Sequence, residues 1–242
     1  GKSPQLVFDD ADMDTAVNGV LGGIFMGLGQ SCIAGSRLLV QDAIHDRFVD
    51  RLVEGMRGVR IGDPFDPATQ LGPVANQLQH DKVLAFIAQA RREGARCVLG
   101  GQAAHPADCG AGWYVEPTIF TDVRPDMQLY REEVFGPVLA VTRFKDEEEA
   151  VRMANDTRFG LAAGVWTRDM ARSMRLSERI AAGTVYVNTY RSVSTLSPVG
   201  GYKHSGYGRE NGMDAIKEFL QVKSVWIGLT PVPDPFPKGK EN

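Results

Sequence analysis

The segment GLGQSCIAGSR, residues 27–37, places one cysteine among glycine and small polar residues. Cys32 follows an apolar run of helical spacing, and neighbours such as Gln30 and Ser31 are too small and polar for the middle of a core. Glycines in the segment permit tight turns and close backbone approach. A thiolate there could act as a nucleophile, with backbone N–H groups stabilising an oxyanion. A free cysteine is also a common buried apolar residue, so both roles stay open.

The other cysteines and the histidines offer no comparable site. Cys97 lies in a strand-like run, where we expect it in the core, and Cys109 lies in a loop, where we expect no function. Three cysteines at irregular spacing favour neither a disulfide framework nor a zinc site. The histidines never fall three or four residues apart, so no metal site is predicted; they are His45, His80, His105 and His204.

The sequence does not support a phosphate-binding loop. GKS at positions 1–3 matches the end of a P-loop, but that motif continues into a helix, and the residue before Pro4 avoids helical geometry. GLGQSC lacks the third glycine of a dinucleotide-binding G-x-G-x-x-G.

Composition restricts the class of protein. The 242 residues are 43% hydrophobic and 24% charged, which suits one large or two small globular domains. A net charge of −3 gives no reason to expect nucleic acid or an anionic membrane as partner. No apolar run is long enough to span a bilayer, and the first residues lack the features of a signal peptide. We therefore expect a reducing, cytoplasmic location.

Strands and helices alternate along the chain. The first helix has an apolar stripe from 13 to 28 that Asp12 can cap, and Gly94 can end the third. Helices are expected over 13–28, 45–56, 76–94, 146–156 and 169–180. Strands are expected over 36–41, 95–101, 114–123, 136–144, 161–167, 183–188 and 218–228. The alternation predicts an α/β fold, a layered open and largely parallel sheet with flanking helices.

Four stretches, in order, resemble the NAD(P)-dependent aldehyde dehydrogenase family. GQSCIAGSR resembles its nucleophile segment and GKSPQLVFDDAD the segment after its catalytic glutamate. REEVFGPV resembles its cofactor-ribose motif, and SPVGGYKHSGYGRENG its C-terminal substrate-side loop. The resemblance runs from Gly1 to about Trp226 and implies the fold of the family's catalytic domain.

The resemblance also implies a chemistry. The Cys32 thiolate adds to an aldehyde to give a thiohemiacetal, hydride passes to NAD or NADP, and water hydrolyses the thioester. The backbone N–H of Cys32 supplies one oxyanion donor. Glu133 binds the nicotinamide-ribose hydroxyls, and Phe135 packs beside the nicotinamide. Glu132, next to Glu133, is expected to be a structural or surface neighbour.

The C-terminal loop carries the remaining implied residues. Glu210 matches an acid near the water path, although a salt bridge or a loop brace stays an open alternative. Val193 and Val199 fall where the family lines its aldehyde tunnel, often with aromatic residues, so their small side chains suggest a roomier pocket. Asn188 is expected to brace its loop, and Arg209 to be a structural partner near the subunit contact.

Two departures from the family pattern stand out. Gly27 replaces an asparagine found in many members, which could loosen the turn before the cysteine. The family's general-base glutamate and its dinucleotide-binding domain lie upstream of the position matching Gly1. The resemblance therefore implies that the dinucleotide-binding domain is absent from this chain and that the chain alone is inactive.

The expected organisation is a catalytic domain over 1–215, an oligomerisation strand over 216–229 and a proline-rich tail over 230–242. In the full-length protein, the strand would join a homodimer or a homotetramer. Two alternatives remain. The family's CoA-acylating subgroup releases the acyl group to coenzyme A and lacks the upstream glutamate, but GYGRENG is closer to the hydrolytic branch. A non-catalytic oligomerisation module would leave Cys32 unreactive.

Overall fold

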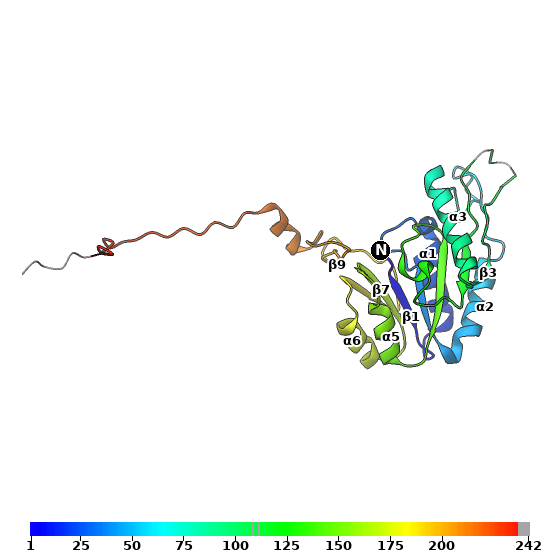
Figure 1. Cartoon of the computed structure of the whole chain (residues 1–242), viewed down its shortest axis with the longest axis horizontal. Coiled ribbons are helices and arrows are strands. Elements are labelled where there is room, and N and C mark those ends of the chain that lie inside the picture. The colour runs from blue at the N-terminus through cyan, green and yellow to red at the C-terminus, as the bar shows by residue number, and fades with distance from the viewer. Residues whose placement is uncertain (108, 111, 237–242) are drawn as a thin grey trace, which may run out of the picture.

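A computed structural model of the chain describes residues 1–107, 109–110 and 112–236. Its centre is a seven-stranded sheet in the order β3-β4-β5-β2-β1-β7-β8 (Figure 1). All neighbouring strands are parallel except β3 and β4, which are antiparallel. The strands are β1 Pro4–Val7, β2 Arg37–Gln41, β3 Arg96–Leu99, β4 Thr118–Thr121, β5 Val138–Phe144, β7 Ala162–Trp166 and β8 Thr184–Val187. The predicted α/β class and largely parallel sheet are confirmed.

Helices cover both faces of this sheet, because parallel strands need crossover connections. Helices α1 (Met13–Phe25) and α2 (His45–Met56) pack on the face that carries Leu38 and Val40 of β2. On the other face, α5 (Glu147–Asn155) and α6 (Met170–Arg179) pack on Leu39, and α3 (Gln77–Arg92) packs on Phe120. Within the described residues, no helix is long and apolar enough to cross a membrane.

Local signals in the sequence decide where helices begin and end. The Asp12 side chain accepts a 3.0 Å hydrogen bond from Thr15 N at the start of α1, as predicted. After α3, Gly94 adopts a φ of +92°, which suits glycine and ends the helix. Pro4 opens β1 instead of leading into a helix, which rules out a P-loop at residues 1–3.

The predicted strand over 218–228 does not form within this chain by itself. A 3-10 helix, η3 (Met213–Phe219), is followed by residues 220–236, which form neither helix nor strand (Figure 1). Trp226 in this segment is 93% exposed. A strand forms only beside another strand that shares its hydrogen bonds, and the described part of the chain provides none here. Residues 237–242 of the predicted tail lie outside the described residues.

Cys97 also differs from its prediction, because it is half-buried instead of lying in the core. It stands on the edge strand β3, and its Sγ donates to the carbonyl of Leu99 at 3.2 Å. An edge strand has a neighbour on one side only, so this position receives less cover than a central one.

Candidate active site

Several motifs meet at one edge of the sheet, where its parallel strands begin. Cys32 comes shortly before β2, Glu133 and Phe135 come before β5, and Gly1 comes before β1. Figure 1 marks the N-terminus at this edge. Segments about a hundred residues apart in the sequence become neighbours, because parallel strands all begin at the same end of the sheet.

A left-handed turn carries the chain from α1 into the cysteine loop. Gly27, Leu28 and Gly29 have φ values of 65°, 58° and 65°. At Gly29, a Cβ atom would lie 2.1 Å from the carbonyl oxygen of Gly136. Only glycine allows this approach, so the cysteine loop and the loop before β5 pack backbone against backbone.

Two side chains from the loop after β8 fasten the cysteine loop on its other side. The hydroxyl of the half-buried Tyr190 donates to the carbonyl of Ile33 at 2.8 Å. Arg191 Nη1 donates to the carbonyl of Met26 at 2.8 Å. Cys32 is therefore displayed on a loop held from both sides.

Cys32 is exposed, which removes the role of a buried apolar residue. Its backbone N–H finds no backbone acceptor in the described part of the chain, so it is available to a ligand oxygen. Burial raises the pKa of Tyr186 on β8, while the charge of Arg191 opposes the rise and that of Cys32 adds a smaller increase. A nucleophile with a free donor beside it is a suitable arrangement for acyl chemistry.

A cavity of about 790 Å³ opens beside Cys32. Val199 and Glu210, two of the predicted site residues, both line it. They are also backbone partners: Val199 N donates to Glu210 O at 2.7 Å, and Glu210 N donates to Val199 O at 2.8 Å. The Glu210 side chain is exposed. The tertiary structure thus places Cys32, Val199 and Glu210 around one cavity.

Val193 does not line this cavity. It is 72% exposed in the loop after β8, and it is absent from the described lining of the cavity. Asn188 braces the same loop, as predicted, because its Oδ1 accepts from Thr167 N at 3.0 Å and its Nδ2 donates to Thr167 O at 2.8 Å. Arg209 has a structural role too, donating to the carbonyl of Gly201 at 3.1 Å.

Glu133 lies on the other side of Gly1 from Cys32. Its carboxylate accepts a hydrogen bond from the α-amino group of Gly1 and is 33% exposed. A Cβ atom on Gly1 would lie 2.5 Å from the carbonyl oxygen of Cys32 and 3.8 Å from Glu133 Oε1. A single residue without a side chain therefore separates the thiol loop from this carboxylate.

Phe135 and Glu132 complete that loop. Phe135 has a φ of 57°, which is rare outside glycine, and its carbonyl accepts a 2.7 Å hydrogen bond from Gln79 Nε2. Glu132 makes an ion pair with Arg158 at 2.8 Å, in keeping with its predicted structural role.

Sequence reasoning missed two buried cations beside the site. Arg37 is 1% exposed and donates to the carbonyls of Lys2, Met153 and Ala154 at 3.0, 2.9 and 2.8 Å. Lys2 is also 1% exposed. An arginine opening the apolar run RLLV was the available signal, since a buried charge must be paired or capped by carbonyls.

Comparison with known proteins bears on this arrangement. The model of the aldehyde dehydrogenase family matches residues 1–225. A betaine aldehyde dehydrogenase from Brucella anthropi is 48% identical over 98% of this chain and 48% of its own length. One from Cereibacter sphaeroides is 49% identical over the same shares, 98% and 48%. The chain thus spans about half the length of the curated relatives it matches.

Solved structures agree with the sequence comparison. Betaine aldehyde dehydrogenase from Staphylococcus aureus, solved with NAD+ and a BME-modified cysteine, superposes with a TM-score of 0.95 at 37% identity, over 98% of this chain and 48% of that one. An NAD-dependent aldehyde dehydrogenase from Sinorhizobium meliloti gives a TM-score of 0.91 at 41% identity, over 96% and 46%. With most of its residues matched by the family model, the chain belongs to the aldehyde dehydrogenase family.

Proposed function

We propose that the protein oxidises an aldehyde to a carboxylic acid with NAD or NADP, and that Cys32 is its nucleophile. The observation that carries the proposal is the placement of Cys32: exposed on a loop fastened from both sides, beside a cavity of about 790 Å³. Its unpaired backbone N–H adds the donor that a tetrahedral oxyanion requires. The relative solved with a BME-modified cysteine supports a reactive thiol in this family.

Each residue then has a defined task. The Cys32 thiolate attacks the carbonyl carbon, and the Cys32 N–H donates to the carbonyl oxygen as it becomes negative. Val199 forms part of the aldehyde-binding wall, and Glu210 supplies a carboxylate beside the water that enters the cavity. Val193, which does not line this cavity, keeps only its predicted place in the aldehyde tunnel.

Glu133 and Phe135 are the residues of this chain that suit a nicotinamide cofactor. The Glu133 carboxylate is partly exposed, so it can accept hydrogen bonds from ribose hydroxyls. Phe135 is held by Gln79 and offers a ring at the same edge of the sheet. When bound, the cofactor supplies the acceptor for the hydride.

The protein also assembles with copies of itself in this proposal, as a dimer or a tetramer. The end of η3 and the segment after it expose a run of large apolar side chains, which is unfavourable in water. They are Phe219, Leu220, Val222, Val225, Trp226 and Ile227. A partner's sheet edge would pair this segment as a strand, which the described residues do not do for it.

Two measurements test the function. On this chain, iodoacetamide labelling followed by mass spectrometry should modify Cys32 faster than Cys97, which is half-buried. On a version extended at its amino terminus to the length of the relatives, absorbance of the reduced nicotinamide should report aldehyde oxidation. Betaine aldehyde and uncharged aliphatic aldehydes form the substrate panel, because the relatives carry that name.

Substitution of the nucleophile gives the sharpest result. Cys32→Ser should lower the turnover of the extended version by about 1,000-fold or more, since a hydroxyl is far less nucleophilic than a thiolate. Cys97→Ser is the matched control and should leave turnover unchanged. Equal labelling of Cys32 and Cys97, together with turnover that survives Cys32→Ser, would contradict the proposal and favour an oligomerisation module.

A further inference from the structure

Arg191 is an arginine beside the cysteine loop, and in the described part of the chain it makes no ion pair. Its Nη1 donates to the carbonyl of Met26 at 2.8 Å, while its Nε and Nη2 donate to nothing within the described residues. By contrast, Arg172 of α6 pairs with the Asp10 carboxylate at 2.9 Å. A guanidinium has five N–H donors, so one carbonyl leaves most of the donors and the whole charge of Arg191 available.

The turn that carries Arg191 lies across the cysteine loop. Tyr190 binds the carbonyl of Ile33, directly after Cys32. Arg191 binds the carbonyl of Met26, which begins the turn before Cys32. Arg191 itself has a φ of 63°, a conformation that is uncommon outside glycine and persists only where the surrounding structure holds the residue in place. The guanidinium is therefore fixed at the cysteine loop.

The segment between that guanidinium and the thiol is compact. From Met26 to Cys32 the chain would span about 20 Å if it were fully extended. A turn closed by Gln30 N and Gly27 O, at 3.0 Å, makes the actual span shorter. One aldehyde can therefore extend from the Cys32 thiol to the guanidinium.

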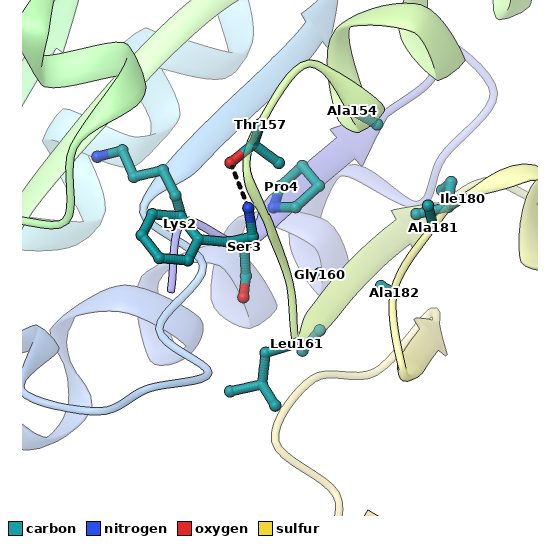
Figure 2. A pocket seen from close by; sticks show the side chains of 12 residues that line it. Lys2, Ser3, Pro4, Ala154, Thr157, Gly160, Leu161, Ile180, Ala181 and Ala182 are labelled. Carbon is teal, nitrogen blue, oxygen red and sulfur yellow. Dashed lines mark hydrogen bonds between the residues drawn. The ribbon is translucent and has the colours of Figure 1, made fainter. Parts of the chain in front are cut away.

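Arg191 is also partly open to solvent, unlike Lys2, another cation beside the site. Lys2 is 1% exposed, and its side chain lines a small pocket together with Ile180 (Figure 2). A ligand that arrives from water cannot reach an ammonium buried in this way. The residue that Arg191 binds, Met26, has an apolar side chain that is 62% exposed. An apolar surface beside an accessible cation suits a ligand with a short carbon chain and an anionic end.

The cavity beside Cys32 carries the opposite charge, and Arg191 is not among its lining residues. Two carboxylates line it, Glu210 and Glu218. Arg209 lines it as well, but its Nη1 donates to two backbone carbonyls, at 3.1 and 2.6 Å. An anionic group would be repelled by the carboxylates of the cavity and attracted by the guanidinium of Arg191.

We propose that Arg191 is a specificity-determining residue, whose guanidinium receives the carboxylate or other anionic group of an aldehyde attacked by Cys32. The inference rests on the proposed function, because it takes Cys32 as the nucleophile. The unoccupied Nε and Nη2 form the edge with which an arginine binds both oxygens of a carboxylate. Aldehydes with a cationic group are disfavoured for the same reason. Arg191 takes no part in the bonds that change at the carbonyl.

The first test uses this chain and needs no turnover. Cys32 is labelled with methanethiosulfonates that carry a sulfonate, no charge or a trimethylammonium group, and the rates are followed by mass spectrometry of the Cys32 peptide. The ratio of the anionic to the cationic rate should fall about fivefold in Arg191→Met and be kept in Arg191→Lys. Arg47→Met, at an exposed arginine near the start of α2, is the control and should leave the ratio unchanged.

The neutral reagent separates charge from structure. If Arg191→Met changes the rates of all three reagents by the same factor, Arg191 only fastens the loop and the proposal is overturned. An unchanged ratio in Arg191→Met, or an equal change in Arg47→Met, would overturn it as well.

The second test measures kcat/KM in the extended version, with a short ω-oxo carboxylate and with its methyl ester. Arg191→Met should lower kcat/KM for the carboxylate about tenfold and change that for the ester by less than about twofold. Arg191→Lys should recover part of the loss, and added salt should reduce the preference of the wild type. Equal losses for the carboxylate and the ester would contradict the assignment.

Failure of the two proposals can be told apart. If the extended version oxidises no aldehyde, the proposed function fails, and the labelling ratios on this chain still decide whether Arg191 sets the charge at the thiol. If the extended version oxidises the carboxylate and the ester equally well in the wild type and in Arg191→Met, the specificity role fails while the proposed function stands.

Discussion

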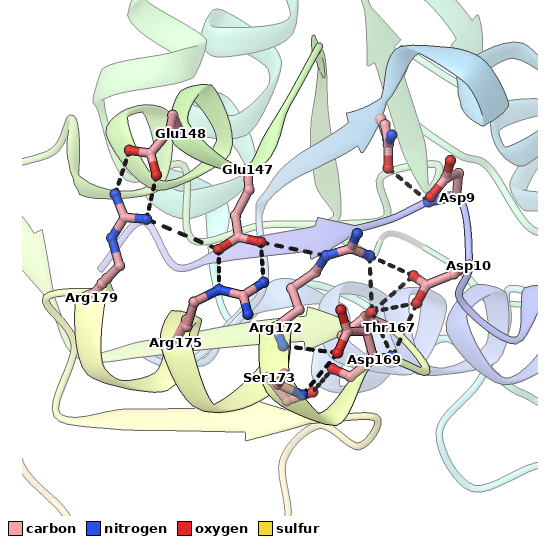
Figure 3. Close-up of polar contacts among 12 residues, drawn as sticks. Asp9, Asp10, Glu147, Glu148, Thr167, Asp169, Arg172, Ser173, Arg175 and Arg179 are labelled. Atoms are coloured by element: carbon pink, nitrogen blue, oxygen red, sulfur yellow. Dashed lines mark hydrogen bonds and ion pairs between the residues drawn. The ribbon is translucent and has the colours of Figure 1, made fainter.

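The two ends of the sheet are fastened in different ways. At the edge where the strands begin, the loops around Cys32 meet through glycine backbones, with Gly29 against Gly136. At the opposite edge, where β1 and β7 end, charged side chains and their hydrogen bonds hold the loops together (Figure 3). The first end is joined closely through glycine backbone, and the second through charged side chains.

Asp10 is the centre of the paired end. Its carboxylate accepts from Thr167 Oγ1 at 2.8 Å, Arg168 N at 3.1 Å, Asp169 N at 3.0 Å and Arg172 Nη1 at 2.9 Å. One carboxylate thus ties the end of β1 to the turn between β7 and α6.

Glu147 and Glu148 extend this network from α5. Glu147 accepts two hydrogen bonds from Arg175, at 2.9 and 2.8 Å, and Glu148 accepts two from Arg179, both at 2.6 Å. These bidentate pairs join the first turn of α5 to α6.

The two ends of the sheet therefore suit different tasks, one stabilising the fold and the other binding a substrate. A carboxylate that already accepts four hydrogen bonds has no capacity left for a substrate. The Cys32 N–H and Lys2 Nζ have no such partners in the described residues, and both lie at the edge where the loops converge. The Cys32 N–H is therefore available to a substrate, whereas the Asp10 carboxylate is not.

The largest effect on stability is expected at the glycine contact. Gly29→Ala puts a Cβ 2.1 Å from the carbonyl oxygen of Gly136, so the two loops must separate. We expect the free energy of unfolding to fall by about 3 kcal/mol or more, measured by urea titration, and iodoacetamide labelling of Cys32 to change in rate.

Gly27→Ala is the matched control for that variant. Gly27 has nearly the same backbone conformation, with a φ of 65°, but nothing lies within 4 Å of an added Cβ. It should cost only the strain of a left-handed residue, about 1 kcal/mol. Equal losses in the two variants would mean that the backbone contact does not fasten this edge.

A smaller loss is expected at the paired edge. Asp10→Ala leaves the Thr167 hydroxyl, two backbone N–H groups and Arg172 without their acceptor, and should lower the free energy of unfolding by about 2 kcal/mol. The rate of Cys32 labelling should stay unchanged, since the site lies at the other edge. The control Asp9→Ala removes an exposed side chain. A change in Cys32 labelling in Asp10→Ala would show that the two edges are coupled.

The smallest effect is expected in the loss of folding stability at acidic pH. Hydrogen bonding from Arg175, aided by the charges of Arg175, Arg172 and Arg179, holds the pKa of Glu147 below its ordinary value of 4.5. The unfolded chain therefore takes up a proton at higher pH than the folded chain, so the stabilisation is present above pH 4.5 and is lost as the pH falls through the lowered pKa.

Glu147→Gln removes that titration. Urea titrations between about pH 6 and pH 3 should show a flatter loss of stability in Glu147→Gln than in the wild type. Glu178→Gln serves as the control, because Glu178 is exposed on α6 and makes no ion pair within the described residues. Identical acid curves for the wild type and Glu147→Gln would show that this pair adds nothing measurable.

Much of the local structure was predictable from the sequence, because its causes are local. The apolar spacing over 45–56 matches α2 residue for residue, and Asp12 caps α1 as expected. By contrast, a strand over 218–228 depends on a neighbouring strand that periodicity cannot reveal, and none forms within this chain.

For the candidate site, too, some features follow from the sequence and others only from the tertiary structure. The sequence by itself determined the residue types: a cysteine among glycines, the EEVFGP loop, and an α/β order that places such loops at strand ends. Tertiary structure alone decided that Val199 and Glu210 line one cavity with Cys32 while Val193 stays outside it, and that Lys2 is buried. Proximity and burial of residues far apart in the chain arise from packing of the whole sheet, which no local pattern encodes.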